Sequence, residues 1–85
     1  MIESVIREIL VERLMLTVAA ADIPVDMPLF EPHSMGGLEL DSLASLEILA
    51  ALSERYGAPF EDAEPADFHS VTTLANYVRR HGGKE

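Results

Sequence analysis

Residues 41–57 read DSLASLEILAALSERYG, a pattern that indicates the class of fold. Apolar residues recur through it at the spacing of one or two helix faces, which predicts a helix from Asp41 or Ser42 to about Tyr56. Either of the first two residues can accept a hydrogen bond from the free N–H groups of the first turn. Gly57 then suits the position that ends a helix.

The N-terminal segment has the same kind of pattern. Apolar residues from Ile2 onward recur at helical spacing and charged residues occupy the opposite face, which predicts an amphipathic helix from Ile2 to about Ala20. Its second half, Leu14 to Ala21, is apolar almost all round. We therefore expect that turn to be buried.

A long loop separates these two helices. Residues 22–40 contain Pro24, Pro28 and Pro32, which remove backbone donors and disfavour a helix at the preceding residues. Loops of this length inside small domains are usually functional or disordered. Leu29 and Phe30 in its middle predict that it is pinned to the core.

The C-terminal third predicts two more helical elements. A short turn is expected around Pro65–Phe68, with Pro65 at its first position. The last helix is expected from Val71 to about Arg80, with Ser70 as its cap. No segment shows the alternation of a strand. The sequence therefore predicts a single all-α domain over residues 1–85, a small four-helix bundle of three main helices and one short helix with a long first loop.

Composition and charge narrow the function. The chain has no cysteine and a net charge of −9, and no lysine or arginine occurs between Arg13 and Arg55. Such a surface repels nucleic acid and anionic membranes, and it attracts basic patches on other proteins. Without disulfides, a membrane span or a signal peptide, we expect a cytoplasmic protein, and we expect a monomer.

Ser42 is the strongest candidate for chemistry, since it lies where a long loop meets a helix N-terminus. It is either a helix cap or a hydroxyl for covalent modification, because the positive end of a helix suits an attached phosphate. A third alternative is a nucleophile, but no G-x-S-x-G motif supports it. We expect no catalytic residue. The acidic residues from Glu61 to Asp67 lack the spacing of a calcium loop, so we expect no metal site.

The helix that follows Ser42 carries more apolar residues than one core-facing stripe needs. Ile48, Leu49, Leu52 and Tyr56 are expected to form its buried side. A second apolar row is flanked by acidic residues: either the helix is buried on two sides, or this row docks basic partners with apolar centres. The row and its acidic flank consist of Leu43, Leu46, Glu47, Ala50 and Glu54.

Taken together, these motifs resemble the acyl carrier proteins and their peptidyl and aminoacyl relatives, from about residue 2 to residue 77. The motifs are Pro28-Leu29-Phe30-Glu31, Leu40-Asp41-Ser42-Leu43, Leu46-Glu47, Arg55-Tyr56-Gly57 and Asp67-Phe68-x-Ser70-Val71-x-x-Leu74. The resemblance implies that Ser42, flanked by Asp41 and Leu43, carries 4′-phosphopantetheine. A separate phosphopantetheinyl transferase would install this arm from coenzyme A with magnesium.

The resemblance also implies a non-catalytic role and a set of partners. The thiol of the arm would hold an acyl or aminoacyl group as a thioester, loaded and used by separate enzymes with basic docking patches. Leu46, Glu47 and Ala50 match the family's partner-facing side. One departure is Glu39, since glycine is frequent in the family two residues before the Asp. The loop end and the preference for a transferase therefore stay open.

Several alternatives remain at this level. Acyl, aminoacyl, peptidyl and D-alanyl carriers share the same signature, because the cargo is chosen by the loading enzyme. A non-covalent acidic helical adaptor would tolerate replacement of Ser42, and a small hydrolase would react with a serine-directed probe.

Overall fold

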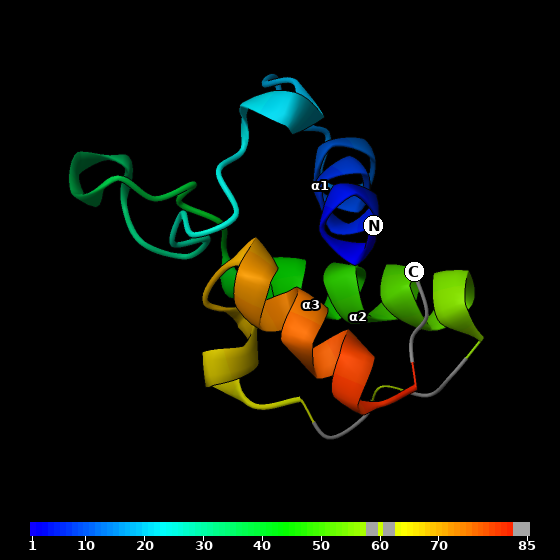
Figure 1. Cartoon of the computed structure of the whole chain (residues 1–85). Coiled ribbons are helices and arrows are strands. Elements are labelled where there is room, and N and C mark those ends of the chain that lie inside the picture. Colours follow the sequence, from blue (N-terminus) through cyan, green and yellow to red (C-terminus); the bar gives the residue numbers. More distant parts are fainter. Residues whose placement is uncertain (58–59, 61–62, 83–85) are drawn as a thin grey trace.

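The computed structural model describes residues 1–57, 60 and 63–82, and it describes Ser42 by its backbone alone. In these residues all regular structure is helical, which confirms the predicted fold class. Figure 1 shows the three main helices packed across one another, with the long first loop extending to one side. They are α1 (Ile2–Arg13), α2 (Ser42–Tyr56) and α3 (Val71–Arg80), with 3-10 turns η1 (Ala20–Asp22), η2 (His33–Met35) and η3 (Pro65–Phe68).

The first helix is shorter than its pattern predicts. α1 ends at Arg13 because Met15 takes a left-handed conformation with a φ of 53°. The backbone N–H of Leu16 then donates to the carbonyl oxygen of Val11 at 3.1 Å, which is the 6→1 hydrogen bond of a Schellman motif. The prediction that the helix continues to Ala20 is therefore wrong.

The apolar segment after α1 is also less buried than predicted. Met15 is 85% exposed and Val18 is 41% exposed. The physical reason is the turn at Met15: once the chain leaves the helix, its apolar side chains no longer share one face. Leu14 and Leu16 are half-buried and pack against the core, so burial of the whole segment is wrong.

The long loop is pinned to the core, as predicted, and it is also hydrogen-bonded to the segment around the start of α3. Leu29 is fully buried, and its backbone N–H donates to the carbonyl oxygen of His69 at 2.8 Å. The N–H of Thr72 donates to the carbonyl oxygen of Val25 at 2.9 Å. Phe30 is half-buried against the core. The loop therefore has a fixed path across the start of α3 before it reaches α2.

The C-terminal elements match their predicted positions. η3 has Pro65 at its first position. The hydroxyl of Ser70 accepts from the N–H of Thr73 at 3.3 Å, and the hydroxyl of Thr73 accepts from the N–H of Ser70 at 2.9 Å. This reciprocal pair satisfies two of the free N–H groups at the start of α3.

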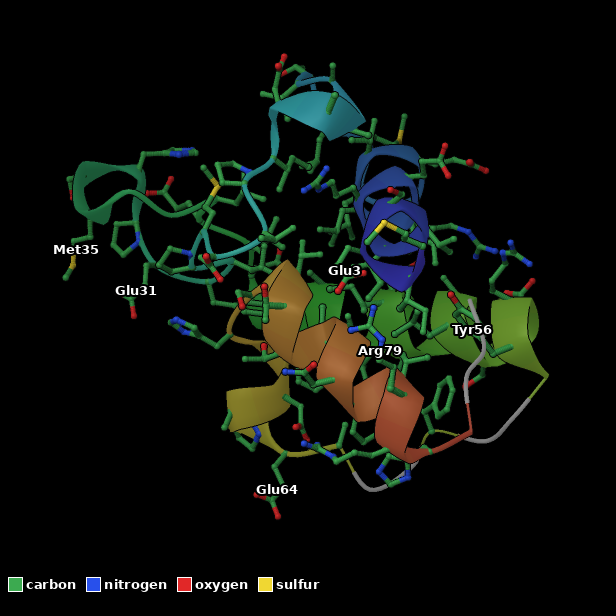
Figure 2. The ribbon with its side chains drawn as sticks, in the orientation of Figure 1. Glu3, Glu31, Met35, Tyr56, Glu64 and Arg79 are labelled. Atoms are coloured by element: carbon green, nitrogen blue, oxygen red, sulfur yellow. The ribbon has the colours of Figure 1, made fainter. Side chains whose placement is uncertain are left out.

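One apolar core unites the three helices. α1 contacts both α2 and α3, and on the outside Arg79 of α3 bonds Glu3 of α1 at 2.8 Å (Figure 2). This hydrogen bond holds the pKa of Glu3 below its ordinary value, because it stabilises the carboxylate. The fully buried side chains include Ile2, Ile6, Leu10, Ile23, Leu29, Ile48, Leu52, Val71, Leu74, Tyr77 and Val78.

Candidate functional site

The structure separates Ser42 from the capping role. Asp41 is extended, with φ −89° and ψ 172°, and its side chain Oδ1 accepts from the N–H of Ala44 at 3.1 Å. Asp41 is thus the N-cap of α2 and Ser42 is its first residue. Because Asp41 fills the capping position, the interpretation of Ser42 as the helix cap is weakened. The side chain of Ser42 lies outside the described part of the structure.

The loop enters α2 through a closed hairpin. The N–H of Leu38 donates to the carbonyl oxygen of Pro28, that of Glu39 to Glu31, and that of Leu40 to Leu29. Gly37 approaches the backbone of Glu31 so closely that a Cβ at position 37 would collide with it. The path of the chain into Ser42 is therefore fixed by backbone hydrogen bonds.

Glu39, which stands where glycine is frequent in the family, has a left-handed backbone conformation. It has a φ of 56°, in the left-handed region that glycine enters at no steric cost. The chain thus keeps at this point a backbone shape that suits glycine, although the residue has a side chain.

The second row of α2 faces solvent. Leu43 and Leu46 are 68% and 64% exposed, so burial on two sides is wrong. At 3.6 residues per turn, the five members of the row fall within an arc of about 100°. All five side chains are exposed, and Glu54 is also bonded to Arg13 at 3.2 Å. The predicted partner-facing residues, Leu43, Leu46, Glu47, Ala50 and Glu54, therefore share one open face.

The predicted buried side of the same helix is confirmed in part. Ile48 and Leu52 are fully buried, whereas Leu49 and Tyr56 are half-buried. Leu49 is half-buried because it borders a hollow.

This hollow is the main feature that sequence reasoning missed. It has a volume of about 470 Å³ and is mostly apolar. Ser45 lies one turn after Ser42, and Leu49 one turn further, so the hollow begins beside the start of α2. The rings of Phe30 and Phe68 meet edge to face at 6.4 Å, which brings the loop against η3. The lining residues are Phe30, Ser45, Leu46, Leu49, Ala63, Pro65 and Phe68.

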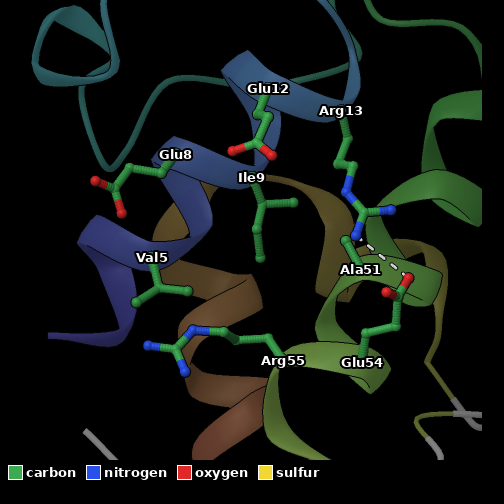
Figure 3. Close-up of a pocket in the computed structure, with 8 residues that line it drawn as sticks. All are labelled: Val5, Glu8, Ile9, Glu12, Arg13, Ala51, Glu54 and Arg55. Carbon is green, nitrogen blue, oxygen red and sulfur yellow. Dashed lines mark hydrogen bonds and ion pairs between the residues drawn. The ribbon is translucent and has the colours of Figure 1, made fainter.

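A second hollow, of about 330 Å³, lies between α1 and the C-terminal half of α2 (Figure 3). Figure 3 shows Arg13 and Glu54 bridging it at one side. Its residues on α2 begin at Ala51, about 13 Å along the helix from Ser42. It mixes charges of both signs with a few apolar side chains, so it differs from the hollow beside Ser42. The other lining residues are Val5, Glu8, Ile9, Glu12 and Arg55.

The histidines and the acidic residues near η3 form no metal site in the part of the chain that the structure describes. His33, His69 and His81 are all exposed. No group of three or more histidine or acidic side chains suited to a metal ion occurs among the residues that the structure describes. Glu61 and Asp62, part of the acidic run, lie outside them. None of the described helices is long and apolar enough to cross a membrane.

Comparison with known families decides the class of protein. A family model described as "Phosphopantetheine attachment site" matches residues 4–78. The chain belongs to this family. The resemblance to carrier proteins is thereby confirmed: the domain bears phosphopantetheine and is non-catalytic. No curated protein and no solved structure gives a significant match.

Membership in this carrier family removes two of the alternatives. A hydrolase using Ser42 is wrong, because the domain is non-catalytic. An adaptor without a covalent group is wrong, because the domain is a phosphopantetheine attachment domain. A carrier of this kind also requires a phosphopantetheinyl transferase and enzymes that load and use the cargo.

Proposed function

We propose that Ser42 is the attachment residue of a single carrier domain spanning residues 1–85. The observation that carries this proposal is its position as the first residue of α2, with the capping role taken by Asp41. Transfer forms a bond between the serine oxygen and the phosphorus of the phosphopantetheine end of coenzyme A. The pyrophosphate bond breaks, adenosine 3′,5′-bisphosphate leaves, and the serine proton passes to solvent or to a base of the transferase.

The residues around Ser42 fit this group. The first turn of α2 contains no acidic side chain, and a helix N-terminus favours a phosphate through its free N–H groups and dipole. Asp41 adds a negative charge next to the site, but its carboxylate is engaged with the N–H of Ala44. When attached, phosphopantetheine supplies the thiol that holds the cargo as a thioester. The chain has no cysteine of its own for that purpose.

For the cargo, the hollow beside Ser42 favours an acyl group with an apolar part. Leu46, Leu49, Phe30 and Phe68 offer it an apolar lining, and burial of each methylene contributes about 0.8 kcal/mol. A D-alanyl or small polar aminoacyl group would gain little there. Aminoacyl or peptidyl cargo with a large apolar side chain is the alternative that the same lining supports.

For the partners, the open face of α2 supports docking of a basic surface with an apolar centre. Leu43 and Leu46 provide the apolar contact, and Glu47 provides charge next to them. Attraction between opposite charges raises the association rate more than the final affinity, which suits a carrier that must also leave.

Intact mass spectrometry tests the attachment residue. The apo protein is incubated with coenzyme A, magnesium and a broad-specificity phosphopantetheinyl transferase. The wild type and Ser45→Ala should each gain one phosphopantetheinyl group, and Ser42→Ala should gain none. Ser45→Ala is the matched control, since it removes the serine one turn away. Modification of folded Ser42→Ala would refute the assignment.

A further inference from the structure

Glu39 holds a backbone conformation that few residues with a side chain adopt. Its φ is 56°, and a Cβ in this region crowds the following carbonyl oxygen. The same loop places a glycine, Gly36, at its other left-handed position, where φ is 80°. Strain of this kind persists only where the surroundings fix it.

The side chain of Glu39 makes contacts that a glycine lacks. Its Oε1 accepts from the backbone N–H of His33 at 3.4 Å, and its Oε2 lies 3.9 Å from Nε2 of the same residue. The imidazole Nδ1 lies 3.0 Å from the carbonyl oxygen of Gly37. Because a carbonyl oxygen only accepts, this contact requires a hydrogen on Nδ1, and a neutral imidazole then has none on Nε2. The backbone N–H of His33 is therefore the hydrogen-bond donor to Glu39. Glu39 and His33 thus close the outer end of the hairpin.

This closure is continuous with the start of α2. The N–H of Glu39 donates to the carbonyl oxygen of Glu31 at 2.8 Å, and the N–H of Leu40 donates to Leu29 at 3.1 Å. Asp41 follows as the cap, and Ser42 is next. A change in the dihedral angles of Glu39 would therefore redirect the two residues that lead into Ser42.

We propose that Glu39 is a positioning residue for phosphopantetheine transfer: its contact with His33 fixes the backbone leading into Ser42, so that the transferase meets the serine in a preset orientation. This inference rests on the proposed attachment at Ser42. Glu39 touches no reacting atom. Loss of its side chain allows residues 39–41 to sample other conformations, and the binding-competent one becomes a smaller fraction of the whole.

Steady-state transfer kinetics on the apo protein test the proposal. Both contacts are exposed and individually weak, so we expect Glu39→Ala to raise KM for the carrier about threefold while kcat stays constant. Glu39→Gly should raise KM as well, since it removes the carboxylate although it relieves the strain. Glu39→Gln should restore KM, because its amide oxygen still accepts from His33. Glu31→Ala, which removes an exposed acidic side chain of the same loop, is the matched control and should leave KM unchanged.

A second pair of variants separates the ring of His33 from its backbone. His33→Ala keeps the backbone N–H that donates to Glu39, so Glu39→Ala should raise KM about threefold in the His33→Ala background as well, as expected for effects that add. A wild-type KM for Glu39→Gly, a KM for Glu39→Gln as high as for Glu39→Ala, or loss of the Glu39→Ala effect when His33 is alanine would each overturn the proposal. Absence of any transfer to the wild type would instead contradict the proposed function.

Discussion

Replacement of Leu46 by alanine gives the sharpest test of the docking face on α2. Leu46 is 64% exposed on the free domain. Complete burial of a leucine side chain contributes about 1.5–3 kcal/mol. Covering its exposed part with a partner therefore contributes about 1–2 kcal/mol, which corresponds to about 5- to 30-fold in affinity. Because alanine keeps only the Cβ, Leu46→Ala should lose most of this contribution.

The assay is the KM for the apo carrier in phosphopantetheine transfer, with urea unfolding of each variant measured in parallel. Leu46→Ala should raise KM toward the calculated range and change the free energy of unfolding by no more than about 0.5 kcal/mol, as is usual for surface positions. Met15→Ala is the control, because Met15 is 85% exposed but lies outside the docking face. If Leu46→Ala stays within twofold of the wild type, or if Met15→Ala has an equal effect, the reasoning is refuted.

Three further predictions address charge, capping and pH. Glu47→Lys should raise the KM for transfer at low salt, and the difference from the wild type should shrink as salt is added, because exposed charges are screened; an effect independent of salt would contradict it. Asp41→Ala should lower the free energy of unfolding by about 0.5–2 kcal/mol, because it removes the cap of α2. Urea unfolding measures this against Asp41→Asn, which keeps a capping oxygen. Equal stability of the two variants would argue against the cap. Because Arg79 lowers the pKa of Glu3, the bridge stabilises the fold above the ordinary pKa of the carboxyl and is lost as the pH falls through the lowered value. Wild type and Glu3→Gln should therefore differ by up to about 1 kcal/mol at pH 7, given a partly exposed pair, and converge in acid; a difference that persists in acid would exclude this cause.

Local patterns predicted the helices wherever side-chain spacing and end signals agree. α2 and α3 begin and end where their capping residues and periodicity indicate, at Asp41, Gly57 and Ser70. The end of α1 was missed because its signal is a left-handed Met15 rather than a glycine. A run of apolar residues does not show where the helix ends. The sequence therefore did not predict that Met15 and Val18, which follow α1, are exposed.

The candidate site divides in the same way. The position of Ser42 at the start of a helix and the apolar row behind it follow from one continuous stretch of sequence. The exposure of that row and the apolar hollow do not. Phe30 and Phe68 reach the hollow from segments that are adjacent only in the folded chain. The contact of Glu39 with His33 depends on a backbone conformation that residue type alone disfavours.

The all-α class, the main helix starts and the family motif therefore follow from the amino-acid sequence, because these depend on neighbours within one or two helical turns. The packing of the whole chain sets which side of α2 faces solvent and where an apolar hollow opens beside Ser42. Those features depend on which distant side chains fill the space around each helix, and local spacing carries no information about them.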